Sequence, residues 1–179
     1  MQTRLATPDD TSQLNALIAR SARELSRGYY SDVEIESAIR YVFGVDTRLV
    51  ADQTYFVVVE GAQLLGCGGW SQRRALYGGD QRPMGAVEEF LDPARDAARI
   101  RAFFVAPDAA RRGVGRLLLH ACTRAARAAG YRQLELMGTL PGVPFYRAQG
   151  FVDVEPVIDV LPDGVALRFV RMRRDLPDA

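Results

Sequence analysis

The spacing of apolar positions predicts two helices in the N-terminal part of the chain. Residues 7–10, Thr-Pro-Asp-Asp, combine a hydroxyl, a proline and two acids, and Leu14, Leu17 and Ile18 follow at helical spacing. Residues 31–34, Ser-Asp-Val-Glu, have the spacing of a capping box, in which serine and glutamate side chains bond to each other's backbone N–H groups. We therefore expect one helix after residue 7 and a second after residue 31.

A third and longer helix is predicted from Gly113 to about residue 129, with Gly130 as its end. Its polar face contains Arg116, His120 and Arg127, which lie together at about 100° per residue. The apolar stripe on the other side is expected to consist of Val114, Leu117, Leu118, Ala121, Cys122 and Ala125.

Six stretches rich in apolar, β-branched or alternating residues predict strands. They are residues 55–59, 64–70, 100–105, 132–137, 151–160 and 165–173. The tight reversal at 60–63 makes a hairpin of the first two, in which Gly66, Gly68 and Gly69 indicate a bulge, a close backbone approach or the bend out of the strand. The polar residues 71–98 are predicted to form a long irregular loop. The order of elements predicts a mixed sheet flanked by helices.

Composition narrows the classes of function. A chain of 179 residues suits one domain, residues 1–179, and 48% hydrophobic with 25% charged residues is typical of soluble globular proteins. The net charge of +1 gives no reason to expect nucleic acid or a membrane as a partner. No apolar run approaches the roughly 20 residues that span a bilayer, and the start does not resemble a signal peptide, so we expect a cytoplasmic protein.

The cysteine and histidine content argues against a metal site. The chain has two cysteines, Cys67 in a predicted strand and Cys122 in a predicted helix, and one histidine. We expect both cysteines to be small buried thiols rather than a disulfide or a nucleophile, and we expect no metal.

Residues 107–116, Pro-Asp-Ala-Ala-Arg-Arg-Gly-Val-Gly-Arg, join a predicted strand to the third predicted helix. The first turn of a helix has unpaired N–H groups and a partial positive charge. Gly113 and Gly115 lack the Cβ atoms that would keep a ligand from those amides. Full positive charges are added by Arg111, Arg112 and Arg116. The segment therefore predicts a site for phosphate or pyrophosphate.

Two common phosphate motifs do not match this segment. A dinucleotide-binding fingerprint requires a third glycine where Leu118 stands, and it lies near the first strand of a parallel unit. A P-loop requires Gly-Lys-Ser/Thr, which is absent from the sequence.

The segment instead resembles the acetyl-coenzyme A loop of the GCN5-related N-acetyltransferases (GNAT). The pattern of that family is Gln/Arg-x-x-Gly-x-Gly/Ala, preceded by a strand and a Pro-Asp/Glu pair. Residues 113–115, Gly-Val-Gly, and 105–108, Val-Ala-Pro-Asp, fit it, whereas Ala110 stands where the family usually has Gln or Arg. The resemblance leaves open which arginine contacts the pyrophosphate.

A second segment, residues 139–152, resembles the C-terminal signature of the same family. Tyr146, Gly150 and Phe151 form Tyr-x-x-x-Gly-Phe, which closes a short helix before a strand. In the family this tyrosine often reprotonates the departing coenzyme A thiolate, so the resemblance makes Tyr146 the candidate catalytic acid. Thr139 stands seven residues earlier, where the family often has Asn.

The resemblance covers most of the chain and implies the GNAT acyl-CoA N-acyltransferase fold. This α/β (α+β) fold has a mixed, mostly antiparallel central sheet of about seven strands flanked by about four helices. It implies acetyl-CoA as co-substrate, bound between the strand at 100–105 and the strand at 133–137, where the two strands splay apart. The implied cofactor-binding residues are Phe103, Phe104, Val105, Arg111, Arg112, Gly113, Val114, Gly115, Arg116 and Thr139.

The acceptor side of the reaction is less determined. Trp70, Arg73 and Tyr77 follow the hairpin where the acceptor pocket of this family often begins, so they are candidate substrate-binding residues. Core packing is an alternative for Trp70, and solubility of the loop is an alternative for Arg73. The base that deprotonates the amine is a carboxylate, a water chain or bulk solvent, with Glu60, Glu88, Glu89 and Glu135 as the candidate carboxylates.

The leading hypothesis is an enzyme that transfers an acetyl group from acetyl-CoA directly to a primary amine of a small molecule in a ternary complex. Protein or peptide N-acetylation is the nearest alternative. A non-catalytic acyl-CoA-binding sensor and a protein that binds another phosphate ligand at 113–116 are the others. The sequence leaves open the acceptor amine, the base, the use of other acyl groups and the oligomeric state, with a homodimer among the options.

Overall fold

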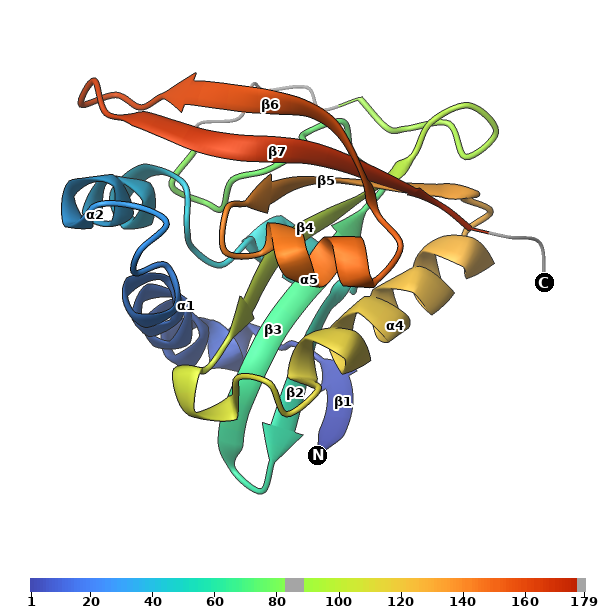
Figure 1. The fold of residues 1–179 in the computed structure, drawn as a ribbon. Helices are drawn as coiled ribbons and strands as arrows, with labels where there is room; N and C mark the ends of the chain where they lie inside the picture. Colours follow the sequence, from blue (N-terminus) through green and yellow to red (C-terminus); the bar gives the residue numbers. More distant parts are fainter. Residues whose placement is uncertain (83–88, 177–179) are drawn as a thin grey trace.

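The computed structural model describes residues 1–82 and 89–176, and a seven-stranded sheet lies at the centre of the protein (Figure 1). The strand order is β1-β2-β3-β4-β5-β7-β6. The strands are β1 Gln2–Leu5, β2 Tyr55–Glu60, β3 Gln63–Ser71, β4 Ala98–Val105, β5 Gln133–Thr139, β6 Val152–Val160 and β7 Ala166–Asp175. Only β4 and β5 are parallel, and the other neighbouring pairs are antiparallel. The predicted mixed, mostly antiparallel sheet is confirmed.

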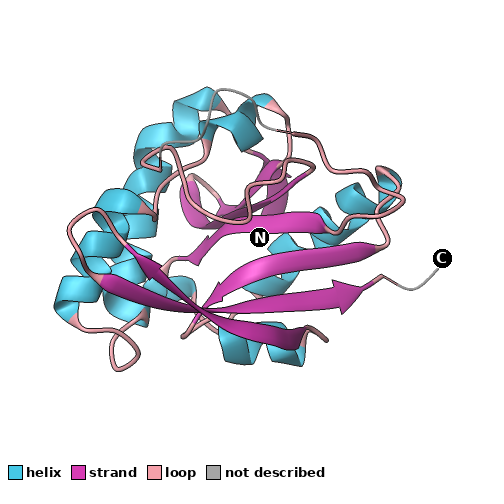
Figure 2. Cartoon of the chain, turned by 90° about the horizontal axis from the view of Figure 1, so that it is seen from above, coloured by secondary structure: helices cyan, strands magenta, loops and turns pink. Residues whose placement is uncertain are grey.

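The helices lie around this sheet (Figure 2). The described residues form α1 Thr11–Leu25, α2 Asp32–Tyr41, α3 Thr47–Ala51, α4 Val114–Ala128 and α5 Val143–Ala148, together with short 3-10 turns at Pro8–Asp10 and Pro107–Ala109. Helix α4 packs on β2, β3 and β4, whereas α1 packs on β3 and β4 and α2 on β7. None of the helices in the described residues has the length and apolar character needed to cross a membrane.

The predicted helix starts are present in the structure. The Ser31 hydroxyl accepts a hydrogen bond from the Glu34 N–H at 3.3 Å, and the Glu34 carboxylate accepts one from the Ser31 N–H at 2.7 Å. The capping box predicted before α2 is therefore confirmed. At the first helix, the proline and acids form a 3-10 turn, and the α-helix itself begins at Thr11.

Two elements were not predicted, and one apolar stripe was predicted on a slightly different face. Strand β1 is a four-residue edge strand, and α3 is a five-residue helix capped by Asp46. In α4, Leu117 is 38% exposed, whereas Leu119 is buried. The buried face of α4 consists of Val114, Leu118, Leu119, Cys122 and Ala126. Both cysteines are free and buried, as expected.

The glycines of β3 allow close packing on that strand. A Cβ atom on Gly66 would lie 2.6 Å from a methyl of Val114, and one on Gly68 would lie 2.4 Å from the Phe103 ring. The pairing of β3 with β4 also shifts register between Cys67 and Gly69. These glycines therefore serve a bulge and a close approach, two of the possibilities left open by the sequence.

The same irregularity appears in β4 as an uncommon backbone conformation. Ala102 has a φ of 53°, which is rare for a residue with a side chain, and its carbonyl accepts a hydrogen bond from the Tyr55 hydroxyl at 3.1 Å. The bulge in β4 is thus held by a side chain from β2, which lies on the other side of β3.

The two central strands separate after a short parallel contact. Residues Ala98, Arg99 and Ile100 of β4 pair with Leu134, Glu135 and Leu136 of β5. Beyond these residues β4 continues to Val105 and β5 to Thr139 without further pairing to each other. The splay expected between these strands is present, and it opens the middle of the sheet.

Candidate functional site

A large groove runs beside the separated strands. Its volume is about 600 Å³, and its walls come from α1, the end of β4, the start of α4, and α5 with the loop before it. Phe103, Phe104 and Val105 form its β4 side, and Thr139 lies at the end of β5. Thr139 and the three β4 residues, which are far from it in the sequence, therefore lie along one surface.

The start of α4 is open toward this groove. Gly113 is the residue before the helix, its φ is 88°, and no side chain caps the helix there. Gly113, Val114 and Gly115 all line the groove. A helix start without a side-chain cap presents its N–H groups and partial positive charge to whatever occupies the space in front of it.

Two of the three arginines of this loop line the groove, and the third does not. Arg111 and Arg116 line the groove, and Arg111 has a φ of 64°. Arg112 does not line it, because its guanidinium turns away to bond the Glu60 carboxylate at 2.8 Å. Of the three arginines expected to contact phosphate, two therefore line the groove.

The two glycines of the loop have different roles. A Cβ on Gly113 would have 3.5 Å to its nearest neighbour, a nitrogen of Arg116, so this glycine leaves open space before the helix. A Cβ on Gly115 would lie 3.1 Å from the Phe145 ring. Gly115 thus allows α5 to approach α4 closely, and it also lines the groove in which the sequence predicts a ligand.

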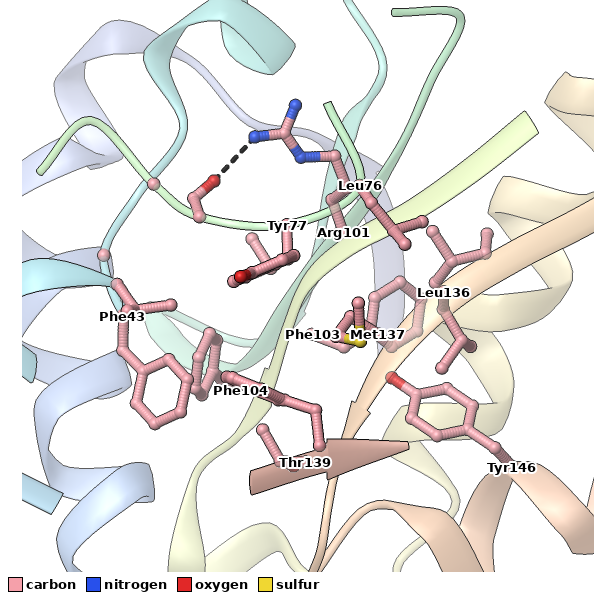
Figure 3. A pocket seen from close by; sticks show the side chains of 17 residues that line it. Phe43, Leu76, Tyr77, Arg101, Phe103, Phe104, Leu136, Met137, Thr139 and Tyr146 are labelled. Carbon is pink, nitrogen blue, oxygen red and sulfur yellow. Dashed lines mark hydrogen bonds between the residues drawn. The ribbon is translucent and has the colours of Figure 1, made fainter. Parts of the chain in front are cut away.

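A second, smaller cavity of about 60 Å³ lies at the gap between β4 and β5 (Figure 3). We call it the chamber. Its walls come from the segment after α2, the loop at 76–79, and strands β4, β5 and β7. Five residues line both the chamber and the groove, namely Phe43, Phe103, Phe104, Thr139 and Tyr146.

Comparison with known protein families identifies the family to which the chain belongs. The family described as "Acetyltransferase (GNAT) family" matches residues 19–151, which is more than half of the chain. The chain is a member of the GNAT family. It is therefore an acetyl-CoA-dependent N-acetyltransferase by family, and acetyl-CoA is its co-substrate.

Several solved structures share the fold of this chain. A GCN5-related N-acetyltransferase from Rhodopseudomonas palustris, described as "Aminotransferase, Class-II", has a TM-score of 0.72 at 18% identity, over 98% of this chain and 95% of that one. PaiA N-acetyltransferase from Thermoplasma acidophilum, in complex with coenzyme A, has a TM-score of 0.65 at 15% identity, over 97% and 98%. Ribosomal-protein-alanine N-acetyltransferase from Brucella melitensis has a TM-score of 0.63 at 20% identity, over 98% and 100%. No curated protein sequence matches the chain.

The groove of this GNAT protein fits acetyl-CoA. The uncapped helix start at Gly113, with Arg111 and Arg116 beside it, provides donors and positive charge for a diphosphate. Beyond Ile100, the edge of β4 is not paired with β5, so its backbone groups can bond to the amides of an extended ligand.

Tyr146 lies at the junction of groove and chamber, and its hydroxyl points into the chamber (Figure 3). The side chain is 8% exposed and packs against Phe103, Phe145 and Phe151. Burial raises the pKa of Tyr146 above its ordinary value of 10.0, and the nearby Cys122 thiol adds to the rise. The phenol therefore keeps its proton at neutral pH.

The start of α5 brings Tyr146 close to Thr139. Gly142 precedes the helix, and a Cβ there would lie 3.2 Å from both the Thr139 hydroxyl and the Tyr146 ring. A larger residue at 142 would push these two side chains apart. The sequence motif contained this glycine, but its spacing alone did not indicate the role.

The structure separates the three candidate substrate-binding residues. Tyr77 lines the chamber, where its ring lies 5.2 Å from that of Phe169. Trp70 lines neither cavity, because it is buried against Tyr131 at a ring distance of 5.9 Å. Arg73 also lines neither, since its guanidinium is bound to Asp52 at 2.8 Å and lies against the Phe90 ring. The alternative of core packing applies to Trp70.

Three of the four candidate carboxylate bases, Glu60, Glu89 and Glu135, line neither cavity. Glu60 and Glu89 are exposed and pair with Arg112 and Arg74, respectively. Glu135 is buried on β5, where Arg99 and Arg171 bind it, and the net effect of its surroundings is to lower its pKa despite burial. Glu88 lies outside the described residues.

A buried ion pair borders the chamber. Arg101 lines the chamber, and its guanidinium contacts the Asp46 carboxylate at 2.8 Å and donates to the Gly78 carbonyl at 2.6 Å. Both side chains are 1% exposed. The pair connects the cap of α3 to the loop that covers the chamber, and it neutralises the arginine within the protein.

Several lining residues were not predicted from the sequence. Phe43 follows α2, Met137 lies on β5 and Phe169 on β7, and all three face the chamber. No local motif surrounds them, and only the tertiary fold brings them together.

Proposed function

We propose that this protein acetylates a primary amine of a small molecule by direct transfer in a ternary complex with acetyl-CoA. The observation that carries the proposal is the meeting of groove and chamber at Tyr146 and Thr139, in the gap between β4 and β5. A co-substrate in the groove and an acceptor in the chamber would face each other there. Both cavities draw on elements from α1 to β7, so we treat residues 1–179 as one catalytic domain.

The groove residues would bind and orient the co-substrate. Acetyl-CoA supplies an acetyl group activated as a thioester, whose sulfur can leave as a thiolate. Gly113, Val114 and Gly115 offer backbone donors at the start of α4, and Arg111 and Arg116 add charge. The β4 backbone from Phe103 to Val105 offers the unpaired edge along which an extended ligand can lie.

Tyr146 is the proposed acid. Its hydroxyl is placed at the junction, and its raised pKa keeps the proton on Oη through the neutral range. A thiolate needs one proton as it leaves, and a positioned acid typically contributes 10²–10⁴-fold to such a step. Thr139 offers a second hydroxyl at the same junction.

The amine is proposed to arrive in its neutral form. No carboxylate lines either cavity within residues 1–82 and 89–176. An ammonium ion has no lone pair and is disfavoured in an apolar space. The proton is therefore proposed to leave to water before the amine nitrogen reaches the chamber.

The size of the chamber favours a small acceptor over a protein. Leu76, Tyr77, Gly78 and Gly79 form part of its wall, and the volume is about 60 Å³. A peptide acceptor needs an open groove for its backbone on both sides of the reacting residue.

The proposal is tested by release of free thiol from acetyl-CoA in the presence of a panel of primary amines and lysine peptides. We expect release above the hydrolysis background with a small amine. Release with lysine peptides alone would instead establish protein acetylation. A thermal shift with acetyl-CoA but no thiol release with any amine would identify a non-catalytic sensor. Absence of any thermal shift would overturn both readings.

A further inference from the structure

The lining of the chamber indicates which small amines it can accept. The walls are formed largely by aromatic and aliphatic side chains. Phe43 and Phe104 pack edge to face at 5.5 Å, and the rings of Tyr77 and Phe169 lie at a tilt 5.2 Å apart. Leu76 and Met137 extend the same apolar surface (Figure 3). Burial of apolar groups in such a space is favourable, at roughly 25 cal/mol per Å² of apolar surface.

The charges around the chamber are already compensated by protein groups. Among the described residues that line it, Arg101 is the charged one, and it is held by Asp46 and by the Gly78 carbonyl. Arg82, which does not line the chamber, lies 4.4 Å above the Tyr77 ring and pairs with Asp159 at 2.7 Å. Both arginines are thus paired within the protein, and the described wall offers no carboxylate to a second ammonium group.

The polar end of the chamber is the junction with the groove. Tyr146 and Thr139 contribute hydroxyls there, whereas Tyr77, Phe169 and Leu76 lie on the walls away from the groove. An acceptor with its nitrogen at the junction would thus place the rest of its body among apolar side chains. A second charge on that body would be buried without a partner, which is costly.

The volume limits the length of the body. A buried water needs about 10–15 Å³ on the same measure, so a chamber of about 60 Å³ takes roughly four to six water-sized groups. A five-carbon chain or a small aromatic group is of this size.

We propose that the acceptor is a compact monoamine with an alkyl or aryl body and no second charged group. This inference rests on the proposed function, because it assigns the acceptor of the same site. In the transfer, the C–S bond of the thioester breaks and an N–C bond forms. The neutral amine loses one proton to water, the thiolate takes one from Tyr146, and water returns a proton to the Tyr146 phenolate.

Pentylamine and 1,5-diaminopentane form a matched test pair, because they differ mainly in whether the far end is a methyl or an ammonium. We expect kcat/KM for pentylamine to be at least about tenfold higher, measured by thiol release from acetyl-CoA. In calorimetric titration of the protein saturated with coenzyme A, pentylamine should bind and the diamine should not. Equal or better use of the diamine, of spermidine or of a lysine peptide would overturn the inference while the acetyl transfer stands.

The binding measurement separates the inference from the proposed function. If pentylamine binds selectively but no thiol is released with any amine, the proposed reaction fails and the apolar amine site stands. If neither amine binds, the acceptor site is overturned.

Leu76 offers a variant that tests the role of charge. It is half-buried on the chamber wall, so Leu76→Glu would place a carboxylate where a second ammonium could pair with it. We expect this change to reduce the preference for pentylamine over the diamine by about tenfold or more, whereas Leu76→Gln, of the same size and without charge, should keep it. An unchanged ratio in Leu76→Glu would place the body of the acceptor elsewhere.

Discussion

Tyr146 is the residue on which the proposed chemistry depends most. Replacing it with Phe keeps the ring that packs against Phe103, Phe145 and Phe151, and it removes the proton donor. We expect Tyr146→Phe to lower kcat by about 100-fold with little change in acetyl-CoA affinity, because general acids contribute 10²–10⁴-fold. Steady-state kinetics and calorimetry measure the two quantities.

The matched control is Tyr131→Phe. Tyr131 is also buried, but it donates to the Leu91 carbonyl at 3.0 Å and lines neither cavity. This variant should lose some stability and keep its kcat. Equal kcat in Tyr146→Phe and Tyr131→Phe would remove Tyr146 from the mechanism.

The pH dependence of the wild type gives a further check on Tyr146. Because burial raises the pKa of Tyr146 above 10.0, kcat of the wild type should not fall between pH 8 and 10 through loss of this acid.

Ala102 shows how a single strained residue can matter for the site. It lines the chamber with a φ of 53°, and the Tyr55 hydroxyl bonds to its carbonyl. We expect Tyr55→Phe to cost about 1 kcal/mol of unfolding free energy, the usual value of one hydrogen bond, and to lower kcat more than it weakens coenzyme A binding. Chemical denaturation and kinetics check this. Retention of wild-type kcat would show that the bulge holds without Tyr55.

At the scale of elements, helix α4 carries a glycine of similar conformation at each end. Gly113 has a φ of 88° and Gly130 a φ of 91°, and a Cβ at either would have at least 3.5 Å to its nearest neighbour. Changing either to Ala should cost about 1–2 kcal/mol, because the left-handed conformation disfavours a side chain. The thermal stabilities of the two variants should therefore be similar.

Only Gly113→Ala should weaken coenzyme A binding, by about tenfold, because its new methyl lies before the helix start that lines the groove. Calorimetry on both variants measures this. If Gly113→Ala and Gly130→Ala bind coenzyme A as tightly as the wild type, the diphosphate is bound elsewhere.

The junction of β1 and α1 gives a pH-dependent contribution to stability. Asp10 accepts bonds from Arg4 and Thr7, and chiefly the Arg4 bond lowers its pKa from 3.8 to about 2. A carboxyl with a lowered pKa stabilises the fold above its unfolded pKa, and this contribution is lost as the pH falls from about 4 to 2. Since Arg4 is 39% exposed, we expect only about 1 kcal/mol.

Denaturation at several pH values tests this contribution. Asp10→Asn should flatten the decline in stability between pH 4 and 2, whereas Asp9→Asn removes a neighbouring charge and keeps the pair with Arg4. A decline as steep in Asp10→Asn as in the wild type would assign the effect to other carboxyls.

The elements that could be predicted are those with local signals. The capping box at Ser31, the glycine loop at Gly113 and the Tyr146 helix are each determined by a few adjacent residues, and all three appear in the structure. Strand β1 and helix α3 have weak local patterns, because β1 is a short edge strand and α3 begins at a buried Asp46. Tertiary contacts decide such elements.

The chamber could not be predicted for a related reason. Phe43, Met137 and Phe169 come from three separate segments, and nothing in their local sequence distinguishes a residue that lines a cavity from one that fills the core. Trp70 shows the converse, since it stood near the expected pocket and packs instead against Tyr131.

At the scale of the whole molecule, the gap between β4 and β5 brings the proposed co-substrate and acceptor sites together. Among the described residues, groove and chamber share the lining residues at Tyr146 and Thr139, and the proposed function therefore has acceptor and co-substrate bound there together. Cys67 and Cys122 line neither cavity, and burial raises the pKa of Cys67 to about 12 and that of Cys122 still further. Neither thiol is suited to carry an acetyl group.

The protein should therefore follow sequential kinetics. Double-reciprocal plots at several fixed amine concentrations should intersect, and mass spectrometry of the protein incubated with acetyl-CoA alone should show no acetylated enzyme. Cys67→Ala and Cys122→Ala serve as controls, and each should keep the intersecting pattern. Parallel lines together with an acetylated protein would contradict the ternary complex, because they would require a nucleophile at the junction that accepts the acetyl group before the amine enters.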